Sequence, residues 1–482
     1  MRIPLPLLRL EDQAEQLAGV AHSASEVPMG VTLFFAAILV CLILCLAFEE
    51  KLHAKKSVIA GGFAALSLLL GTAFGLLPFG PVVVGGHELD LPIYIPAIEW
   101  DVIAIILGSS LFVDITSRSG LFTWIAIKLT KASAGDPRRL LWFYGLMTVV
   151  FSAVLNNVTA MIIVGSLTAV SLGKLDRKVL LPAFLLIEGL LTNIGGLLTL
   201  ISSVPNIIVG TTAGISFASF FIKASPYVVL ATLLTLWMGM RRFGIPGLAN
   251  AEEKAEAALQ VGAFDENDGV SSKGAFWFGA LSLVAFIGVI ASASVLPLID
   301  ELGMGFVALL FAAIALMKYK SEADAFYRDL DWDLLGFFCS LFVVINVMEH
   351  AAVLDLVGVG LGHVIALGET TGSSLLLATS AIASSVTDNI PLAAMLARIL
   401  DSDAAISGQA NSPFWWAVVF GANLGGNLTP IGSASTLVAV TVMHKHGIKI
   451  SFLGFVKKAL PFAVVQIALA IVWLLLLGWL FA

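Results

Sequence analysis

Two stretches of the chain, 193–206 and 423–436, carry the polar groups most suited to chemistry. They read NIGGLLTLISSVPN and NLGGNLTPIGSAST and are identical at seven of fourteen aligned positions. Paired glycines, hydroxyl side chains and prolines interrupt a helix, and an interruption frees backbone carbonyls and amides. Hard cations bind oxygen ligands of this kind, whereas anions bind amides and the positive end of a helix. Both stretches are therefore candidates for binding a small ion or solute.

A short polar tip inside an apolar segment precedes each stretch, at 156–157 and 387–389. The first candidate site combines its tip with the first stretch, in the set Asn156, Asn157, Thr159, Asn193, Gly195, Gly196, Thr199, Ser202, Ser203 and Asn206. The second combines its tip with the second stretch, in the set Thr387, Asp388, Asn389, Asn423, Gly425, Gly426, Thr429, Gly432 and Ser433. The alternative is structural: the glycines permit close helix packing and the hydroxyls bond their own helix.

Two acidic residues lie within these apolar segments. A carboxylate at mid-depth, such as Asp388, costs about 2.5–3.5 kcal/mol even on the lenient insertion scale. Its counterpart at the first tip is the neutral Asn156. Asp388 is predicted to bind a cation, carry a proton or do both, against the alternative of a neutral acid that closes the tip. Glu188 is either a second proton or cation group or a structural acid. No cationic side chain is expected near either tip.

The composition indicates a polytopic membrane protein. The 482 residues are 59% hydrophobic and 12% charged, whereas soluble proteins have about 25% charged residues. Apolar runs long enough to cross a bilayer recur throughout the chain. Cys41, Cys45 and Cys339 have no metal-ligand spacing. The sequence has no nucleotide-binding loop and no evident nucleophile–base pair, so neither an enzyme nor a cofactor is expected. Sodium is the candidate ion, membrane lipid is an expected partner, and nucleic acid is not.

The segments divide into two similar halves. The two polar tips are predicted to be the tips of hairpins, because each arm of the first, about 15 residues or about 22 Å of helix, is shorter than the hydrocarbon core of about 30 Å. The alternative is a conventional helical pair. The expected order is an N-terminal segment (1–29), two scaffold spans (30–98), a first repeat (99–242) with hairpin 140–172 and broken helix 179–221, a linker (243–273), two scaffold spans (274–319), and a second repeat (331–482) with hairpin 373–400 and broken helix 413–442.

Three further matches support duplication. The pair Trp100-Asp101 aligns with Trp332-Asp333, the first tip aligns with the second at an offset of 232, and SFASFFIKASP at 216–226 aligns with SFLGFVKKALP at 451–461. The loops at 49–56, 118–139, 173–178, 241–273, 318–328 and 444–458 hold 22 of the 26 Lys and Arg residues. If these loops are cytoplasmic, the two repeats cross the membrane in opposite senses and the hairpins enter from opposite sides. The expected fold is all-α and polytopic, with two inverted repeats, each containing a re-entrant hairpin and a broken transmembrane helix.

The broken segments, the tips LNNVTA and TDNIPL, and the Trp-Asp openings resemble the ion transporter superfamily. The nearest branch is similar to the arsenite permease and sodium/proton antiporter group, with citrate-transporter-like permeases close by. The resemblance covers about 30–482. It implies a homodimer, a scaffold, and a transport part that moves as an elevator. It also implies that the tips and the glycine pairs hold sodium and substrate.

Inverted repeats with broken helices are typical of secondary transporters. The leading hypothesis is a sodium/proton antiporter of the cell membrane, the bacterial inner membrane. The second is a permease for an oxyanion, a di- or tricarboxylate or arsenite, coupled to sodium or protons. A channel-like pore is a third and weaker alternative.

Overall fold

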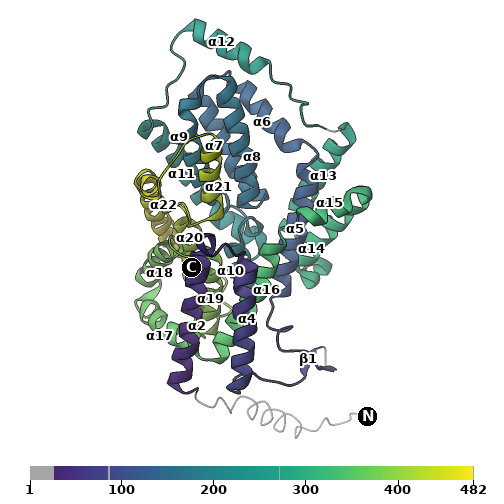
Figure 1. The fold of residues 1–482 in the computed structure, drawn as a ribbon, viewed down its shortest axis with the longest axis vertical. Coiled ribbons are helices and arrows are strands. Elements are labelled where there is room, and N and C mark those ends of the chain that lie inside the picture. The colour runs from purple at the N-terminus through teal and green to yellow at the C-terminus, as the bar shows by residue number, and fades with distance from the viewer. Residues whose placement is uncertain (1–26, 85–86, 271, 481–482) are drawn as a thin grey trace, which may run out of the picture.

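The computed structural model describes residues 27–84, 87–270 and 272–480 (Figure 1). Within these residues, ten helices are long and apolar enough to cross a membrane, and the chain is a multi-pass membrane protein. One small antiparallel hairpin, β1 (Val82–Val84) with β2 (His87–Leu89), interrupts the helical fold. The predicted N-terminal segment, 1–29, lies outside the described residues except for its last three positions.

Two series of seven helices follow the same order. The first series is α5 (Trp100–Ser117), α6 (Leu121–Ala132), α7 (Pro137–Val154), α8 (Asn157–Lys174), α9 (Leu181–Gly195), α10 (Val204–Thr212) and α11 (Phe217–Arg242). The second is α16 (Trp332–His350), α17 (Val353–Ile365), α18 (Gly368–Ser384), α19 (Asn389–Ser402), α20 (Pro413–Gly425), α21 (Ala434–Lys445) and α22 (Phe452–Leu480). Both hairpins, α7–α8 and α18–α19, and both broken helices, α9–α10 and α20–α21, are present as the sequence predicts.

The polypeptide leaves helical geometry just after each glycine pair. In the first break, Thr199 and Ser203 are extended on either side of a short 3-10 turn, η2 (Leu200–Ser202). In the second, Ser433 has φ −150° and ψ 151° and begins α21 as its N-cap. The proline of the first stretch, Pro205, stands in the first turn of α10, where its missing amide hydrogen costs nothing. Each break therefore leaves backbone polar groups to be satisfied by other elements.

The repeats are inverted. In Figure 1 the first hairpin, α7 and α8, lies toward the end of the molecule that carries the linker helix α12 (Ala251–Gly262), whereas α17 and α18 lie toward the opposite end, which carries β1. The hairpins thus enter from opposite sides. In each hairpin one acid or amide residue caps the returning helix: Asn156 Oδ1 accepts a hydrogen bond from the amide of Thr159 at 2.8 Å, and Asp388 Oδ1 accepts one from the amide of Ile390 at 3.0 Å.

The remaining long helices build a scaffold with α5 and α16. They are α2 (Met29–Ala47), α4 (Lys56–Ala73), α13 (Lys273–Ala291) and α14 (Pro297–Lys318). Helix α4 packs along α16, and α14 packs along α5. The second contact is close, since a Cβ atom built on Gly108 would lie 2.4 Å from the carbonyl carbon of Ala308. We call these six helices the scaffold, and we call the hairpins, the broken helices, α11 and α22 the core, because their main packing contacts are with one another.

The Trp-Asp pairs make the same contacts in both repeats. The indole of Trp100 donates to the carbonyl of Ile95, and that of Trp332 donates to the carbonyl of Tyr327. The following acid binds the partner scaffold helix: Asp101 Oδ1 accepts from the amide of Gly305 at 3.1 Å, and Asp333 Oδ1 accepts from the amide of Ser57 at 3.1 Å. Each repeat therefore anchors a helix that precedes the other repeat in the chain.

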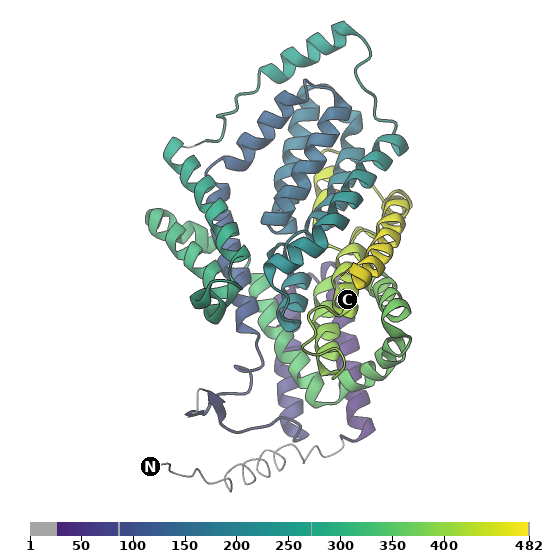
Figure 2. The same cartoon turned by 180° about the vertical axis from the view of Figure 1, so that it is seen from behind.

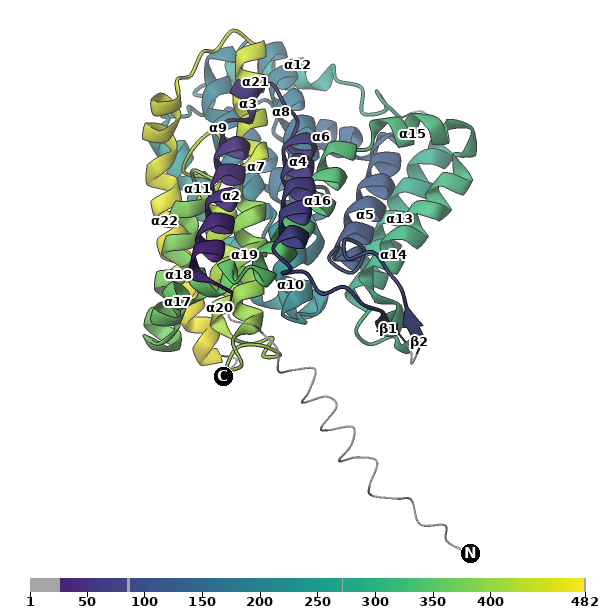
Figure 3. The same cartoon turned by 60° about the horizontal axis from the view of Figure 1, so that its bottom comes forward.

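Short elements complete the chain, and Figure 3 shows α3 and α15 at the opposite end from the β-hairpin. They are α3 (Glu49–Leu52), η1 (Lys178–Leu180), η3 (Lys320–Glu322) and α15 (Ala323–Asp329). The polar linker between the halves passes over the ends of the first-repeat helices (Figure 2). It is docked there, because Glu266 accepts hydrogen bonds from Lys128 at 2.6 Å and from Lys131.

This docking gives a pH dependence. Hydrogen bonds from Lys128 and then Lys131 lower the pKa of Glu266 from 4.5 to about 2. A carboxyl with a lowered folded-state pKa stabilises docking above its usual pKa, and the contribution disappears as the pH falls toward 2. We expect Glu266→Gln to raise amide exchange in 243–273 about two- to fivefold at pH 7, as befits an exposed pair. Hydrogen exchange measures this, with the exposed Glu256→Gln as control. Equal exchange in both variants would contradict the docking.

Candidate functional site

The first hairpin tip is bonded to the break of its own repeat. Thr199 Oγ1 donates to the carbonyl of Ala153 at 2.5 Å, and Ser152 Oγ lies 2.7 Å from both the carbonyl of Thr192 and Asn157 Oδ1. The amide of Asn157 covers Gly196, where an added Cβ would approach it to 2.7 Å. The tip, the end of α9 and the break thus form one hydrogen-bonded unit.

The second hairpin repeats most of these bonds. Thr429 Oγ1 donates to the carbonyl of Ser385 at 2.6 Å, and Ser384 Oγ donates to the carbonyl of Ala422 at 2.6 Å. The atoms nearest to a Cβ on Gly426 belong to Ser433, Asn193 and Asn423, so the second tip does not place Asn389 as the first places Asn157. Thr387 Oγ1 donates to the carbonyl of Ala383 in its own helix, which agrees with the structural alternative. Gly432 packs against the glycine pair and Thr429.

Two glycines allow the hairpins to approach this closely. A Cβ on Gly425 would lie 2.3 Å from the carbonyl oxygen of Ala381, and one on Gly195 would lie 2.7 Å from that of Val149. Each glycine meets the backbone of the hairpin arm of its own repeat. A flexible side chain could move aside, but a helix backbone cannot do so cheaply.

Gly425→Ala is therefore expected to lower the free energy of unfolding by about 1–3 kcal/mol, the usual cost of overpacking. Thermal unfolding in detergent measures the effect. Gly62→Ala on the scaffold helix α4 is the matched control, because nothing lies within 4 Å of a Cβ built there. Equal melting temperatures for the two variants would show that the hairpin arm can shift to accommodate the added methyl group at little cost.

Polar side chains satisfy the free carbonyls inside each break. Asn206 Nδ2 donates to the carbonyls of Gly196 at 2.6 Å and Thr199 at 3.0 Å, and Ser202 Oγ donates to the same two carbonyls. In the second break Thr436, at the position of Asn206, lies 3.5 Å from the equivalent carbonyls of Gly426 and Thr429. These two carbonyls are thus bonded more closely in the first break, whereas Thr436 Oγ1 bonds mainly to the carbonyl of Ser433, at 2.8 Å.

The amides of Asn193 and Asn423 connect the two breaks. Asn193 Nδ2 donates to Ser433 Oγ at 2.9 Å, and Ser203 Oγ donates to Asn423 Oδ1 at 2.7 Å. Asn423 Nδ2 also donates to Asn206 Oδ1 at 2.8 Å. The sequence assigned Asn193 to the first site and Asn423 to the second, and the structure shows that each side chain bonds to the opposite break. The two candidate sites are one connected unit related by a pseudo-twofold.

A buried polar chain that the sequence did not single out extends this unit. Asn193 Nδ2 also donates to Asn427 Oδ1 at 2.8 Å, whose Nδ2 donates to Gln466 Oε1 at 2.8 Å, and Gln466 Nε2 donates to Thr235 Oγ1 at 2.9 Å. Ser435 Oγ donates to Asn193 Oδ1 at 2.9 Å. The available signal was the lone Gln466 in an otherwise apolar span, since an isolated amide in a membrane helix needs a partner.

Lys56 stands against the second tip. Its Nζ lies 2.5 Å from Asp388 Oδ2. The expectation that no cationic side chain lies near either tip was therefore wrong. The charge pattern placed Lys56 at the end of a loop, but it is the first residue of α4, and the hairpin tip reaches it from 332 positions away.

Glu188 is fully buried in α9. Its Oε1 accepts a hydrogen bond from Thr168 Oγ1 of α8 at 2.6 Å, and its Oε2 has no hydrogen-bond partner within the described part of the chain. A buried carboxyl with an unsatisfied oxygen is costly unless a proton or another partner reaches it. Its geometry suits a group that takes up and releases a proton.

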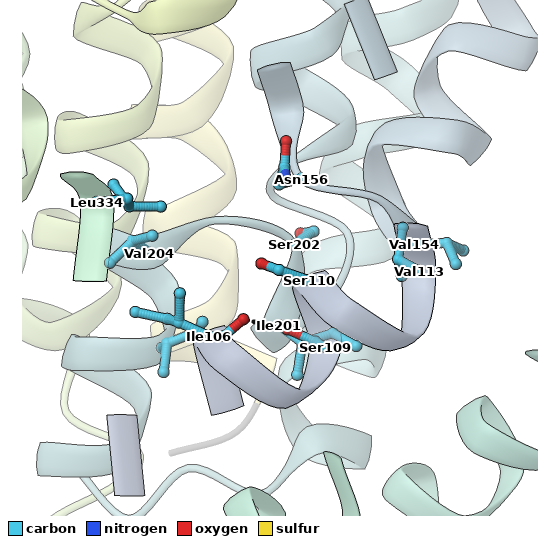
Figure 4. Close-up of a pocket in the computed structure, with 11 residues that line it drawn as sticks. Ile106, Ser109, Ser110, Val113, Val154, Asn156, Ile201, Ser202, Val204 and Leu334 are labelled. Carbon is cyan, nitrogen blue, oxygen red and sulfur yellow. Dashed lines mark hydrogen bonds between the residues drawn. The ribbon is translucent and has the colours of Figure 1, made fainter. Parts of the chain in front are cut away.

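A pocket beside the first break brings core and scaffold residues together (Figure 4). Asn156 and Ser202 of the core and Ser109 and Ser110 of α5 supply its polar lining, with apolar residues around them. Its empty space is about 420 Å³, including the open mouth. A second cavity borders the other break at Ile431, the counterpart of the first pocket's Ile201. Hydroxyl and amide oxygens at the first pocket suit a small cation or a hydrogen-bonding solute.

Comparisons with known proteins agree with this architecture. The family described as "Citrate transporter" matches residues 43–421. An uncharacterized transporter of Mycobacterium tuberculosis is 29% identical over 380 residues, 78% of this chain and 86% of the relative. The P protein of Homo sapiens is 25% identical over 520 residues, 89% of this chain and 61% of that protein. The crystal structure of the Alcanivorax borkumensis YdaH transporter has a TM-score of 0.56 at 15% identity, covering 88% of this chain and 98% of that one.

Proposed function

Since this chain belongs to the citrate transporter family, we propose that it is a secondary active transporter that exchanges sodium ions for protons across the membrane. The observation that carries the proposal is the excess of acid over base around the helix breaks. Asp388 is paired with Lys56, whereas Glu188 is fully buried in α9 and has only the hydroxyl of Thr168 as a hydrogen-bonding side-chain partner among the described residues. Two carboxyls and one ammonium leave a place for a further cation or proton, which is what an exchanger requires.

The packing supports movement of the core against the scaffold. The breaks, tips and polar chain are bonded together within the core, whereas α4–α16 and α5–α14 pack mainly within their own pairs and touch the core less. The first pocket lies between the two groups, with α5 on one side and the first break on the other. A core that slides as one body would carry both breaks together, because Asn193 and Asn423 join them. A homodimer, with its contact through the scaffold, belongs to the same proposal.

Two observations favour a second candidate, a permease for a di- or tricarboxylate. The family's description names citrate, and the ammonium of Lys56 stands at the second tip, where it could bind a carboxylate. In that mechanism Asp388 would release Lys56 to the substrate. The oxygen-rich first pocket supplies hydroxyl and amide groups for either kind of substrate.

Transport by purified protein in liposomes distinguishes the candidates. An outward or inward sodium gradient is imposed, and the internal pH is followed with a trapped dye. We expect sodium gradients, and not choline gradients, to move protons in the opposite direction. Liposomes without protein control for leakage. Uptake of labelled citrate that saturates, with no sodium-driven proton movement, would replace the antiporter with the permease.

A further inference from the structure

Both oxygens of the Asp388 carboxylate have a hydrogen-bond partner, and one of these partners is Lys56. Asp388 Oδ2 lies 2.5 Å from Lys56 Nζ, and Oδ1 accepts from the amide of Ile390 at 3.0 Å. The side chains are 30% and 13% exposed, so the pair is partly shielded from water. A charged hydrogen bond in such surroundings is stronger than one on the surface. A cation that binds Asp388 Oδ2 therefore competes with the ammonium of Lys56.

The pair joins the core to the scaffold, two groups whose helices pack against each other much less than they pack within each group. Lys56 is the first residue of the scaffold helix α4, and Asp388 is the N-cap of α19 at the tip of the second hairpin in the core. Arg398 of α19 also contacts Glu99, just before the scaffold helix α5. Among the described residues, no ion pair connects the first hairpin to the scaffold. The second hairpin is therefore the one that charge holds in place.

Comparison of the repeats shows that the two charges occur together. Ser57 binds Asp333 as Gly305 binds Asp101, so these backbone positions are equivalent. The residue before Ser57 is Lys56, and the residue before Gly305 is Met304. The counterpart of Asp388 is Asn156. The second repeat with its anchored helix α4 carries both an acid and a base, whereas the first repeat with its anchored helix α14 has neither at these positions. This difference indicates that the pair serves a purpose distinct from the common architecture.

The ammonium of Lys56 has other carboxylates within reach if Asp388 moves away from it. Glu49 Oε1 lies 3.9 Å from its Nζ, and Asp333 is held one residue away by Ser57 Oγ at 2.5 Å. The ammonium can thus remain charged and paired on the scaffold. The carboxylate, in contrast, would be left bare by any movement of the core. An unpaired charge inside the membrane is costly.

We propose that Lys56 is the coupling residue of this transporter: its ammonium holds the unloaded core against the scaffold, and a cation or proton on Asp388 releases it. The inference rests on the proposed function, because it presumes a core that moves with a cation or proton. Lys56 stays on the scaffold and keeps its proton, while the sodium ion or proton crosses with Asp388. A core with no ion on Asp388 stays paired with Lys56 and cannot move. The core therefore carries a sodium ion or a proton in each direction, and the result is exchange without leakage.

A cross-linking experiment tests whether the Lys56–Asp388 ion pair, which we call the tie, holds the core against the scaffold. The cross-link is placed away from the pair itself. Ile106 of α5 and Val204 of α10 line the same pocket from the scaffold and the core (Figure 4). In a full-length protein with Cys41, Cys45 and Cys339 changed to serine, Ile106→Cys and Val204→Cys are joined by a short bifunctional thiol reagent. The cross-linking yield measures the fraction of protein in which the core lies against the scaffold, the state that we call docked. Measurements in choline chloride and in sodium chloride are made in liposomes.

In choline we expect Lys56→Gln to raise the ratio of undocked to docked core about ten- to a hundredfold, the effect of losing a charged hydrogen bond. Lys55→Gln, one residue earlier, should cross-link like the parent protein. Sodium should lower the yield of the parent but not that of Lys56→Gln. The charge-exchanged variant, Lys56→Asp with Asp388→Lys, should restore the yield in choline and make it insensitive to sodium, which also shows that these chains fold.

An unchanged yield for Lys56→Gln in choline would overturn the proposal, because it would mean that other contacts, such as Arg398 with Glu99, hold the core without Lys56. The cross-linking readout is independent of the transported substrate. If the tie is present but sodium moves no protons in the liposome assay, the proposed function fails while the role of Lys56 as a tie stands. If sodium moves protons while Lys56→Gln stays docked, the proposed function stands and this inference fails.

Discussion

Asp388→Asn is expected to lower sodium-driven proton movement more than about a hundredfold, because losing one charge from a shielded ionic site costs about 3–5 kcal/mol. The fold should survive. An asparagine oxygen can still accept from the amide of Ile390, so the N-cap of α19 is kept. Lys56 can turn to Glu49, which lies 3.9 Å away. The variant thus removes the cation-binding charge while keeping the shape of the hairpin tip.

The measurement is the initial rate of internal pH change in liposomes after a sodium gradient is imposed. Asp355→Asn is the control, since it makes the same substitution on an exposed position of α17. Thermal unfolding confirms that both variants fold. Exchange at the normal rate by Asp388→Asn would remove the antiporter mechanism, because no other acid lies at either tip.

The second large effect is expected at the amides that connect the breaks. Asn423→Ala leaves Ser203 Oγ and Asn206 Oδ1 without their partner, and both atoms are buried. Each unsatisfied buried group costs about 1–3 kcal/mol, although membrane proteins often show smaller values near 0.6 kcal/mol. We expect the free energy of unfolding to fall by about 2 kcal/mol and transport to fall at least about tenfold, since both breaks lose a fixed position.

Asn193→Ala tests the pseudo-twofold directly. It breaks the equivalent bond to Ser433 and also the bonds to Asn427 and Ser435, so its effect should equal or exceed that of Asn423→Ala. Asn346→Ala on the scaffold helix α16 is the matched control. Transport and thermal unfolding are measured for all three. Normal transport by both site variants would show that the connection between the breaks is dispensable.

The sequence was sufficient for the architecture because each main feature has a local signature. Glycine pairs followed by hydroxyl residues predicted the breaks, and the repetition of a whole pattern, from Trp100-Asp101 to the tips, predicted the second half from the first. The alternation of basic loops predicted opposite orientation. These signals are local patterns of residues, so they can be recognised from the sequence without knowing which distant segments are in contact.

The partners of the site residues could not be predicted in the same way. The position of Asn193 on its helix follows from the 3.6-residue period, but which neighbour faces it depends on how two distant helices cross. Lys56 shows the same limit, because a lysine at the end of a span looks like any other basic loop residue. The polar chain through Gln466 was missed because it consists of single residues spread over three helices.

The exchange of α4 and α14 between the repeats has a consequence for biogenesis. The acid that anchors α4, Asp333, lies 276 positions beyond Ser57, and the amide that binds Asp101 lies 204 positions beyond it. At a ribosomal rate of about 5–20 residues per second, α4 waits about 14–55 seconds in the lipid for its anchor to be synthesised. Neither half can mature alone during translation, so the nascent chain must keep its early helices inserted and unpaired until the late ones arrive.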